Sequence, residues 1–272
     1  MLGTAHTLVN IFFCDRKYLP EPLLTDVTEF LDRGPYRLAY RRLSGNTPGV
    51  MFCGGFMSDM TGSKATALAA HCATQGRAFL RFDYAGHGAS GGRFEDGTIS
   101  QWRDDALAAL DGLTDGPQVV VGSSMGGWIA LLLALARPRR VRGLVLLAPA
   151  PDFTQIIIDR ELSPAERERL QRDGRIERPS EYSEQPYVIT RRLIEDGHRH
   201  RLLDAPIALS CPVRIVHGMR DSDVAWQQSI TLLERLQGED SHLTLLKNGD
   251  HRLSGEADLA RLTGLVEALC NA

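Results

Sequence analysis

The sequence predicts an α/β fold in which helices cover both faces of a mostly parallel, doubly wound sheet. Its 272 residues fit one large α/β unit. Hydrophobic residues make up 43% of the chain and charged residues 24%, which is typical of a globular protein with a substantial core. Short apolar, β-rich runs alternate with helix-length segments along most of the chain. We therefore expect a single domain over residues 1–272.

The expected strands are continuously apolar, as in parallel strands buried on both faces. They are Val50–Cys53, Ala78–Phe82, Val119–Val121, Gly143–Leu147, Val213–Val216 and Leu243–Leu246. The expected helices place apolar residues near helical spacing. They are Ser63–Thr74, Ser100–Leu113, Met125–Ala136, Trp226–Leu236 and Asp258–Cys270. Arg37–Leu43 alternates apolar and charged side chains, which indicates an antiparallel strand before the parallel series.

The alternation of strands and helices stops between Pro151 and Pro206. The run SPAERERLQRDG and a stretch around Tyr187–Asp196 predict two polar helices with no strand between them. We therefore expect residues 151–206 to form a helical cap inserted in the domain. Its acids and arginines are nearly balanced, which favours a solvated surface over a charged binding patch.

Charge and cysteine content exclude several classes of function. The formal net charge is -3 and the arginines are interleaved with acids, so we expect no nucleic-acid partner. The cysteines are odd in number and have no C-x-x-C spacing, which argues against a disulfide framework and a zinc site. They are Cys14, Cys53, Cys72, Cys211 and Cys270. We expect neither a metal nor another cofactor.

The apolar stretch Leu8–Cys14 has no basic leader and no cleavage site, and it is too short to span a membrane. Residues 1–25 also lack the composition of a mitochondrial presequence. We expect an ordered arm, no stable membrane insertion and a cytoplasmic location.

The motif G-x-S-x-G spans Gly122 to Gly126, between a β-branched run and an apolar helix. A sharp strand-to-helix turn holds its central serine in a strained conformation, and larger residues at the glycines would clash with the neighbouring strand and helix. The helix N-terminus favours a developing oxyanion. We predict that Ser124 is a nucleophile. Ser123 lacks glycines at two-residue spacing and is expected to be structural.

A serine nucleophile needs a histidine to accept its proton and a carboxylate to orient that histidine. With this motif the acid follows the serine and the histidine comes last. The segment CPVRIVHGMRDSDVAW carries two candidate acids after a strand. Asp221 fits the spacing H-G-x-x-D-x-x-V and is the predicted acid, while Asp223 is the alternative. We expect His217 to pack at the strand end.

The predicted base is His251, in the loop after the last strand. His242 also follows the acid, but it precedes that strand and is expected at the opposite end of the sheet. Asp250 neighbours His251 and is interpreted as a turn residue.

A glycine-rich loop after an earlier strand, in VMFCGGFMSDM, supplies the second half of an oxyanion hole. Gly54 and Gly55 let the backbone turn, so that the N–H groups of Phe56 and Met125 are the predicted donors. The segment RFDYAGHGASGG is also glycine-rich, but it lacks both G-x-G-x-x-G and the P-loop ending. We expect it to buttress the fold, with His87 as a structural residue.

From about Val50 onward, the chain resembles the abhydrolase-domain family of palmitoyl-protein thioesterases and acyl-glucuronide esterases. The resemblance rests on GGFMSDMTGSK, LRFDYAGHG, DGPQVVVGSSMGGW and HGMRDSDV followed by DHR. It implies an α/β-hydrolase fold, with Ser124, Asp221 and His251 as the triad and Phe56 and Met125 as the oxyanion donors.

These residues together predict a serine hydrolase that cleaves acyl thioesters or carboxylic esters through an acyl-enzyme on Ser124. The resemblance implies small-molecule or acylated-protein substrates, and a mitochondrial location if the chain follows the family's eukaryotic members. The alternatives are another reaction of the same fold, such as C–C bond or peptide hydrolysis, and a noncatalytic binding module, which is expected to lack a triad member.

Overall fold

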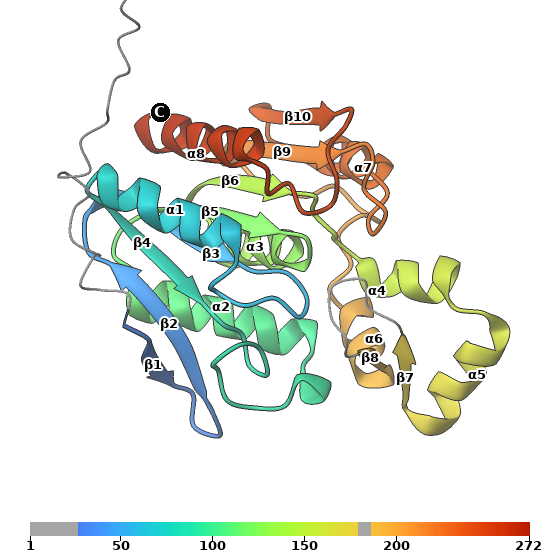
Figure 1. Ribbon diagram of the computed structural model, residues 1–272. Coiled ribbons are helices and arrows are strands. Elements are labelled where there is room, and N and C mark those ends of the chain that lie inside the picture. Colours follow the sequence, from blue (N-terminus) through green and yellow to red (C-terminus); the bar gives the residue numbers. More distant parts are fainter. Residues whose placement is uncertain (1–26, 179–185) are drawn as a thin grey trace, which may run out of the picture.

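The protein is described by a computed structural model over residues 27–178 and 186–272 (Figure 1). The stretch Leu8–Cys14, for which an ordered arm was expected, lies outside these residues. An eight-stranded sheet forms the centre, in the order β1-β2-β4-β3-β5-β6-β9-β10. Strand β2 runs antiparallel to both of its neighbours, and all other pairings in this sheet are parallel. The strands are β1 (Glu29–Asp32), β2 (Arg37–Leu43), β3 (Asn46–Cys53), β4 (Arg77–Phe82), β5 (Gln118–Ser123), β6 (Val141–Leu147), β9 (Val213–Gly218) and β10 (Ser241–Leu246).

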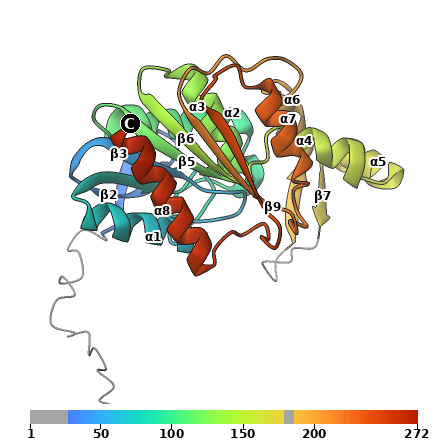
Figure 2. The same cartoon turned by 90° about the horizontal axis from the view of Figure 1, so that it is seen from above.

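Helices cover both faces of the sheet (Figure 2). Helices α1 (Ser63–Thr74) and α8 (Glu256–Asn271) lie on one face, and α2 (Ile99–Leu113), α3 (Met125–Ala136) and α7 (Gln227–Arg235) lie on the other. Side chains alternate between the faces along each strand. In β3, Val50 and Phe52 pack with α1 and α8, whereas Met51 and Cys53 pack with α2 and α3. The strands are therefore buried on both sides, which confirms the doubly wound fold predicted from their continuous hydrophobicity.

The predicted elements match the structure closely in the middle of the chain. Helices α1 and α3 and strand β2 have the predicted bounds. Strand β1 was not predicted, because its four residues, EFLD, form a mostly exposed sheet edge and carry little apolar pattern.

Between β6 and β9 the chain leaves the sheet and forms a separate group of elements. These are α4 (Phe153–Ile156), a π-helical turn (Ile157–Glu161), α5 (Pro164–Asp173), β7 (Arg175–Arg178), β8 (Tyr187–Thr190) and α6 (Arg191–His198). Helices α5 and α6 confirm the two predicted helices, but the expected absence of a strand between them was wrong, since β7 and β8 form an antiparallel pair. Gly174, with φ +74°, ends α5 and turns the chain into β7. Ile176 and Ile189 then face each other in register and join a small apolar cluster, which favours strands over helix.

The parallel strands all end at one edge of the sheet, and the loops that follow β3, β5, β9 and β10 carry the predicted site residues. Ligand sites in open α/β sheets form at this carboxyl edge. Within the described ranges, no helix combines the length and the apolar character needed to cross a membrane.

Candidate active site

Ser124 lies at the sharp turn between β5 and α3. Its backbone has φ +55° and ψ -122°, a region that residues other than glycine rarely occupy. Ser124 N–H donates to the Leu147 carbonyl oxygen at 2.9 Å, and the Ser124 carbonyl oxygen accepts from the amides of Gly127 and Ala150 at 2.8 and 3.1 Å. These bonds fix the strained conformation on both sides of the residue.

The glycines of the motif are required by close packing around this turn. A Cβ on Gly122 would collide with the carbonyl oxygen of Gly126, and a Cβ on Gly126 would collide with the carbonyl oxygens of Cys53 and Gly54. Helix α3 therefore approaches the end of β3 at backbone distance, as the motif predicts.

The three predicted residues Ser124, His251 and Asp221 form one hydrogen-bonded chain. His251 Nε2 lies 3.1 Å from Ser124 Oγ, and His251 Nδ1 lies 2.7 Å from Asp221 Oδ2. With Nδ1 protonated, the imidazole donates to the carboxylate and its Nε2 accepts from the serine hydroxyl. This geometry allows proton transfer from Ser124 to His251.

The side chain of Asp221 is fully buried, and its neighbours hold it ionised. Burial alone would raise the pKa of Asp221, but hydrogen bonds from His217 and His251, the charge of His251 and the backbone N–H of Val224 hold it well below its usual range. The Asp221 Oδ1 atom accepts from the amides of Asp223 and Val224 at 2.9 and 2.8 Å. The carboxylate is therefore fixed as an acceptor for the imidazole.

His217 has a larger role than the strand-end packing predicted for it. Its Nε2 lies 3.0 Å from Asp221 Oδ2 and its Nδ1 lies 2.7 Å from Ser229 Oγ, in a fully buried position. His217 thus helps to orient Asp221 through Oδ2, the same oxygen that His251 contacts. The four-residue spacing of His217 and Asp221 across a strand end is the sequence signal that points to this contact.

The alternative candidates do not occupy the positions of acid and base in this hydrogen-bonded chain. Asp223 Oδ2 is 4.0 Å from His251 Nε2, on the Ser124 side of the ring. His242 is the second residue of β10, at the opposite end of that strand, and it is mostly exposed. Asp250 accepts from the Leu253 amide at 2.9 Å within the turn, in agreement with its predicted role.

The loop that follows β3 lies against the Ser124 turn. A Cβ on Gly55 would come within 3.4 Å of both Ser124 Cβ and the Ser123 carbonyl oxygen. The next residue, Phe56, packs its ring against Phe94, Phe153 and Trp102, with centroids 4.8, 5.6 and 5.9 Å away. These contacts hold the ring of Phe56 next to the glycine that packs against Ser124.

The glycine-rich loop after β4 supports the loop after β3, as predicted. Met57 N–H donates to His87 Nε2 at 3.3 Å, and Met60 N–H donates to Asp83 Oδ1 at 2.7 Å. Burial lowers the pKa of His87 to about 4, so this imidazole is neutral near pH 7 and its Nε2 remains an acceptor. Ser90, the centre of a second G-x-S-x-G spacing at residues 88–92, donates to the Asp83 carbonyl oxygen at 2.6 Å and has a structural role.

Among residues 27–178 and 186–272, one group has the composition of a metal site. Donor atoms of Asp221, Asp223 and His251 lie within 4.8 Å of one another. However, His251 Nδ1 and Asp221 Oδ2 already bind each other. The group is therefore engaged in the chain that leads to Ser124.

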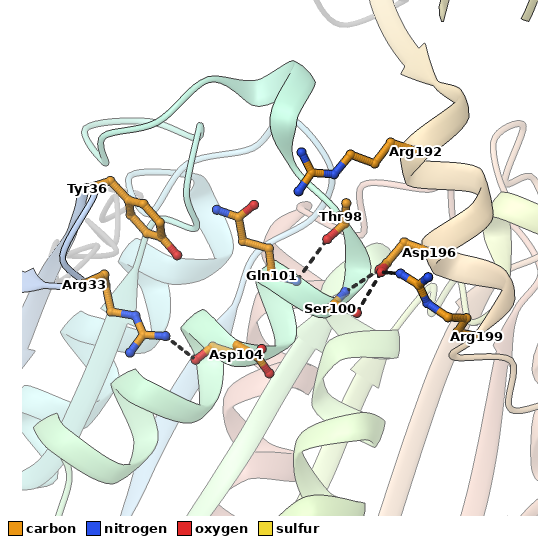
Figure 3. A pocket seen from close by; sticks show the side chains of 9 residues that line it. All are labelled: Arg33, Tyr36, Thr98, Ser100, Gln101, Asp104, Arg192, Asp196 and Arg199. Atoms are coloured by element: carbon orange, nitrogen blue, oxygen red, sulfur yellow. Dashed lines mark hydrogen bonds and ion pairs between the residues drawn. The ribbon is translucent and has the colours of Figure 1, made fainter. Parts of the chain in front are cut away.

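A polar pocket of about 390 Å³ lies between α2, α6 and the β1–β2 turn (Figure 3). Ser100 N–H and Oγ–H donate to Asp196 at 2.7 and 2.8 Å and so join α2 to α6. The pocket contains none of the residues Ser124, Asp221 and His251. Its lining residues are Arg33, Tyr36, Thr98, Ser100, Gln101, Asp104, Arg192, Asp196 and Arg199.

The chain is similar in sequence to known proteins over most of its length. Residues 48–171 match the family described as serine aminopeptidase, S33. The chain is 40% identical over 243 residues to the mouse protein named palmitoyl-protein thioesterase ABHD10, mitochondrial, covering 88% of this chain and 81% of that protein.

Two solved structures are similar over nearly their whole length. A putative hydrolase from Agrobacterium vitis S4 superposes with a TM-score of 0.85 at 42% identity, covering 90% of this chain and 98% of that one. Mouse alpha/beta hydrolase domain-containing protein 10 superposes with a TM-score of 0.84 at 39% identity, with the same coverage. Because the similarity in sequence and in fold covers most of this chain and most of each relative, the chain belongs to the α/β-hydrolase family of the ABHD10 thioesterases and is an enzyme that hydrolyses esters or thioesters.

Proposed function

We propose that this enzyme cleaves acyl thioesters and carboxylic esters with Ser124 as nucleophile, His251 as general base and Asp221 as the acid that orients His251. The observation that carries the proposal is the continuous hydrogen-bonded chain from Asp221 through His251 to a serine in a strained turn. Neither a metal nor a cofactor takes part in the proposed steps.

In the first half-reaction, Ser124 Oγ attacks the acyl carbonyl carbon while His251 Nε2 accepts the hydroxyl proton. Asp221 holds the imidazole in the required tautomer and stabilises its positive charge. The tetrahedral intermediate then collapses, and the protonated His251 gives the proton to the leaving alkoxide or thiolate, which departs as the alcohol or thiol. In the second half-reaction His251 deprotonates a water molecule, which attacks the acyl carbonyl carbon. His251 then returns the proton to Ser124 Oγ as the ester bond breaks and the carboxylic acid leaves.

The N–H groups of Phe56 and Met125 are the proposed donors to the oxyanion. Gly55 brings the loop after β3 against Ser124, and Met125 opens α3, where the positive end of the helix dipole lies. A thiolate leaves with less acid assistance than an alkoxide does, so the same site serves thioesters and activated esters.

We assign the acyl chain of the substrate to the apolar side chains of residues 151–206, which we propose form a cap. Ile157 and Ile158 belong to an apolar cluster of this segment that extends to Phe56 and Phe153. Phe56 follows the glycines next to Ser124, so an acyl chain bound along this cluster would have its carbonyl near the nucleophile. Since similar proteins are named palmitoyl-protein thioesterases, a long acyl chain on a protein or on a small molecule is the proposed substrate class.

Labelling by a fluorophosphonate probe tests the nucleophile. We expect the wild-type chain to be labelled and the Ser124→Ala variant to remain unlabelled, with Ser90→Ala as a matched control at the second G-x-S-x-G spacing. Equal labelling of wild type and Ser124→Ala would overturn the proposal.

Peptide hydrolysis is the second candidate, because the family matched by residues 48–171 is described as an aminopeptidase. A panel of acyl thioesters, aryl esters, acyl glucuronides and aminoacyl amides separates the two. We expect turnover of the first three, and a preference for the aminoacyl amides would favour the peptidase.

A further inference from the structure

The loop that carries His251 is fixed to the rest of the protein on both sides of the histidine. On the N-terminal side, the amide of Arg220, next to Asp221, donates to the Gly249 carbonyl oxygen at 2.9 Å. On the C-terminal side, the ammonium group of Lys64 donates to the carbonyl oxygen of Arg252. The first bond couples the base to the acid loop, and the second couples it to the start of α1, 188 residues away in sequence.

The positive charge of Lys64 lies at a helix N-terminus, where it is unfavourable for helix stability. Lys64 is the second residue of α1, whose first turn contains no acidic residue and whose Gly62 N-cap supplies no side-chain cap. A positive charge at a helix N-terminus opposes the helix dipole. Residues that break such a local rule are often retained for function.

The chain also uses lysine sparingly. Only three of its 31 basic residues are lysines, and the others are arginines. The lysines are Lys17, Lys64 and Lys247. Lysine provides a compact ammonium group on a flexible stem, which suits donation to a single backbone carbonyl in a half-buried place. The guanidinium of an arginine is a broad, planar fork.

We infer that Lys64 is a positioning residue for the proposed base: by binding the Arg252 carbonyl oxygen, it holds the His251 loop so that Nε2 stays within reach of Ser124 Oγ. This inference rests on the proposed function, because it assigns Lys64 a role through His251. Lys64 belongs to the MTGSK segment, which the triad and the oxyanion hole leave without a role.

The surroundings of Lys64 add a pH dependence. Burial lowers the pKa of Lys64 to about 8, while the carboxylates of Asp250 and Asp258 oppose the shift and the guanidinium of Arg252 adds to it. Above pH 8 the neutral amine is a weaker donor than the ammonium group, so the loop loses part of its anchor. Turnover in the wild type should therefore fall as the pH rises through about 8.

The test compares Lys64→Met with Lys64→Arg, and with Lys247→Met as the matched control. Lys247 is exposed and lies just after β10, four residues before His251. For an aryl ester substrate we expect Lys64→Met to lower kcat about 10- to 100-fold, with KM changed less than twofold, because a misplaced catalytic group slows the chemical step. Lys64→Arg should restore most of kcat, and Lys247→Met should match the wild type.

A folded Lys64→Met variant with wild-type kcat would overturn the inference. If that variant shows no thermal unfolding transition, the pH profiles of wild type and Lys64→Arg decide. The fall in kcat above pH 8 should be absent in Lys64→Arg, and coincident profiles would overturn the inference. Fluorophosphonate labelling of the wild type separates the two proposals, since an unlabelled wild type contradicts the role of Ser124 itself.

Discussion

Asp221 and Asp223 are two residues apart, yet only Asp221 contacts Nδ1 of His251, the ring nitrogen that does not face Ser124. Asp221 Oδ2 lies 2.7 Å from Nδ1, whereas Asp223 Oδ2 lies 4.0 Å from Nε2. Because His217 and the amides of Asp223 and Val224 also bind Asp221, its carboxylate has a fixed direction. The backbone of Asp223 thus serves the site more directly than its side chain does.

The pair offers a matched test of the acid. Asp221→Asn should lower kcat about 10³- to 10⁴-fold, because an amide at this position no longer favours the imidazole tautomer that accepts the serine proton. Asp223→Asn should stay within about fivefold of the wild type. Both values come from steady-state hydrolysis of an aryl ester, and the reverse order of the two variants would move the acid to Asp223.

For single residues, the sequence predicted the three members of the candidate site but not the residues that hold them in place. The G-x-S-x-G spacing, the H-G-x-x-D spacing and the position of His251 after the last strand name Ser124, Asp221 and His251, since each depends on a local pattern at a strand end. The spacing of His217 and Asp221 points to their contact but does not fix the direction of either side chain. The contact of Lys64 with Arg252 joins segments 188 residues apart, which no local pattern specifies.

Among the elements, α3 and β3 approach each other most closely where the motif glycines lie. The carbonyl oxygens of Cys53 and Gly54 occupy the space that a side chain on Gly126 would need. This approach brings the loop after β3 to Ser124, so the same glycine serves both packing and the proposed oxyanion hole.

Two helical glycines test this approach. Gly126→Ala should lower the free energy of unfolding by roughly 1–3 kcal/mol, because backbone atoms must move to admit the methyl group. Gly264→Ala, in α8, meets nothing within 4 Å and should raise it by roughly 0.5–1 kcal/mol through higher helix propensity. Urea unfolding measures both, and a neutral or stabilising Gly126→Ala would contradict the close approach.

The elements that sequence reasoning missed are those whose stability comes from neighbours. Strand β1 is short and mostly exposed, and it forms because the edge of β2 is available for pairing. Strands β7 and β8 have four residues each, and their facing pair Ile176 and Ile189 packs in the small apolar cluster. Helices α1 and α3 were predicted accurately because their apolar residues mark their whole length.

At the scale of the whole molecule, hydrogen bonds at the two ends of the segment 151–206 join it to itself and to the α/β core. The buried carboxylate of Asp152 accepts from the amides of Leu202 and Leu203 at 2.9–3.1 Å, so that the entry and exit of the segment are joined. Trp128, in α3, adds a hydrogen bond from Nε1 to the His200 carbonyl oxygen at 3.1 Å. The segment is therefore anchored to the helix that begins at the proposed nucleophile.

Loss of the Asp152 contacts should loosen this segment as a unit. Asp152→Ala leaves the amides of Leu202 and Leu203 without their acceptor, so trypsin should cut α5 near the exposed Arg169 and Arg172 several-fold faster than in the wild type. Asp204→Ala, which removes an exposed carboxylate paired with Arg201, is the control and should leave the rate unchanged. Equal cleavage rates in the two variants would contradict a fastening role for Asp152.

The ring of Phe56 packs both against the main core and against the apolar cluster of residues 151–206, and the preceding residue, Gly55, lies against Ser124. One side chain thus connects the surface proposed for the acyl chain with the amide proposed for the oxyanion. A long chain that packs on this ring would steady the amide during the reaction, whereas a short chain would leave it looser. Chain length would then influence how fast a bound substrate reacts, in addition to how tightly it binds, and the enzyme would discriminate among acyl groups in the transition state.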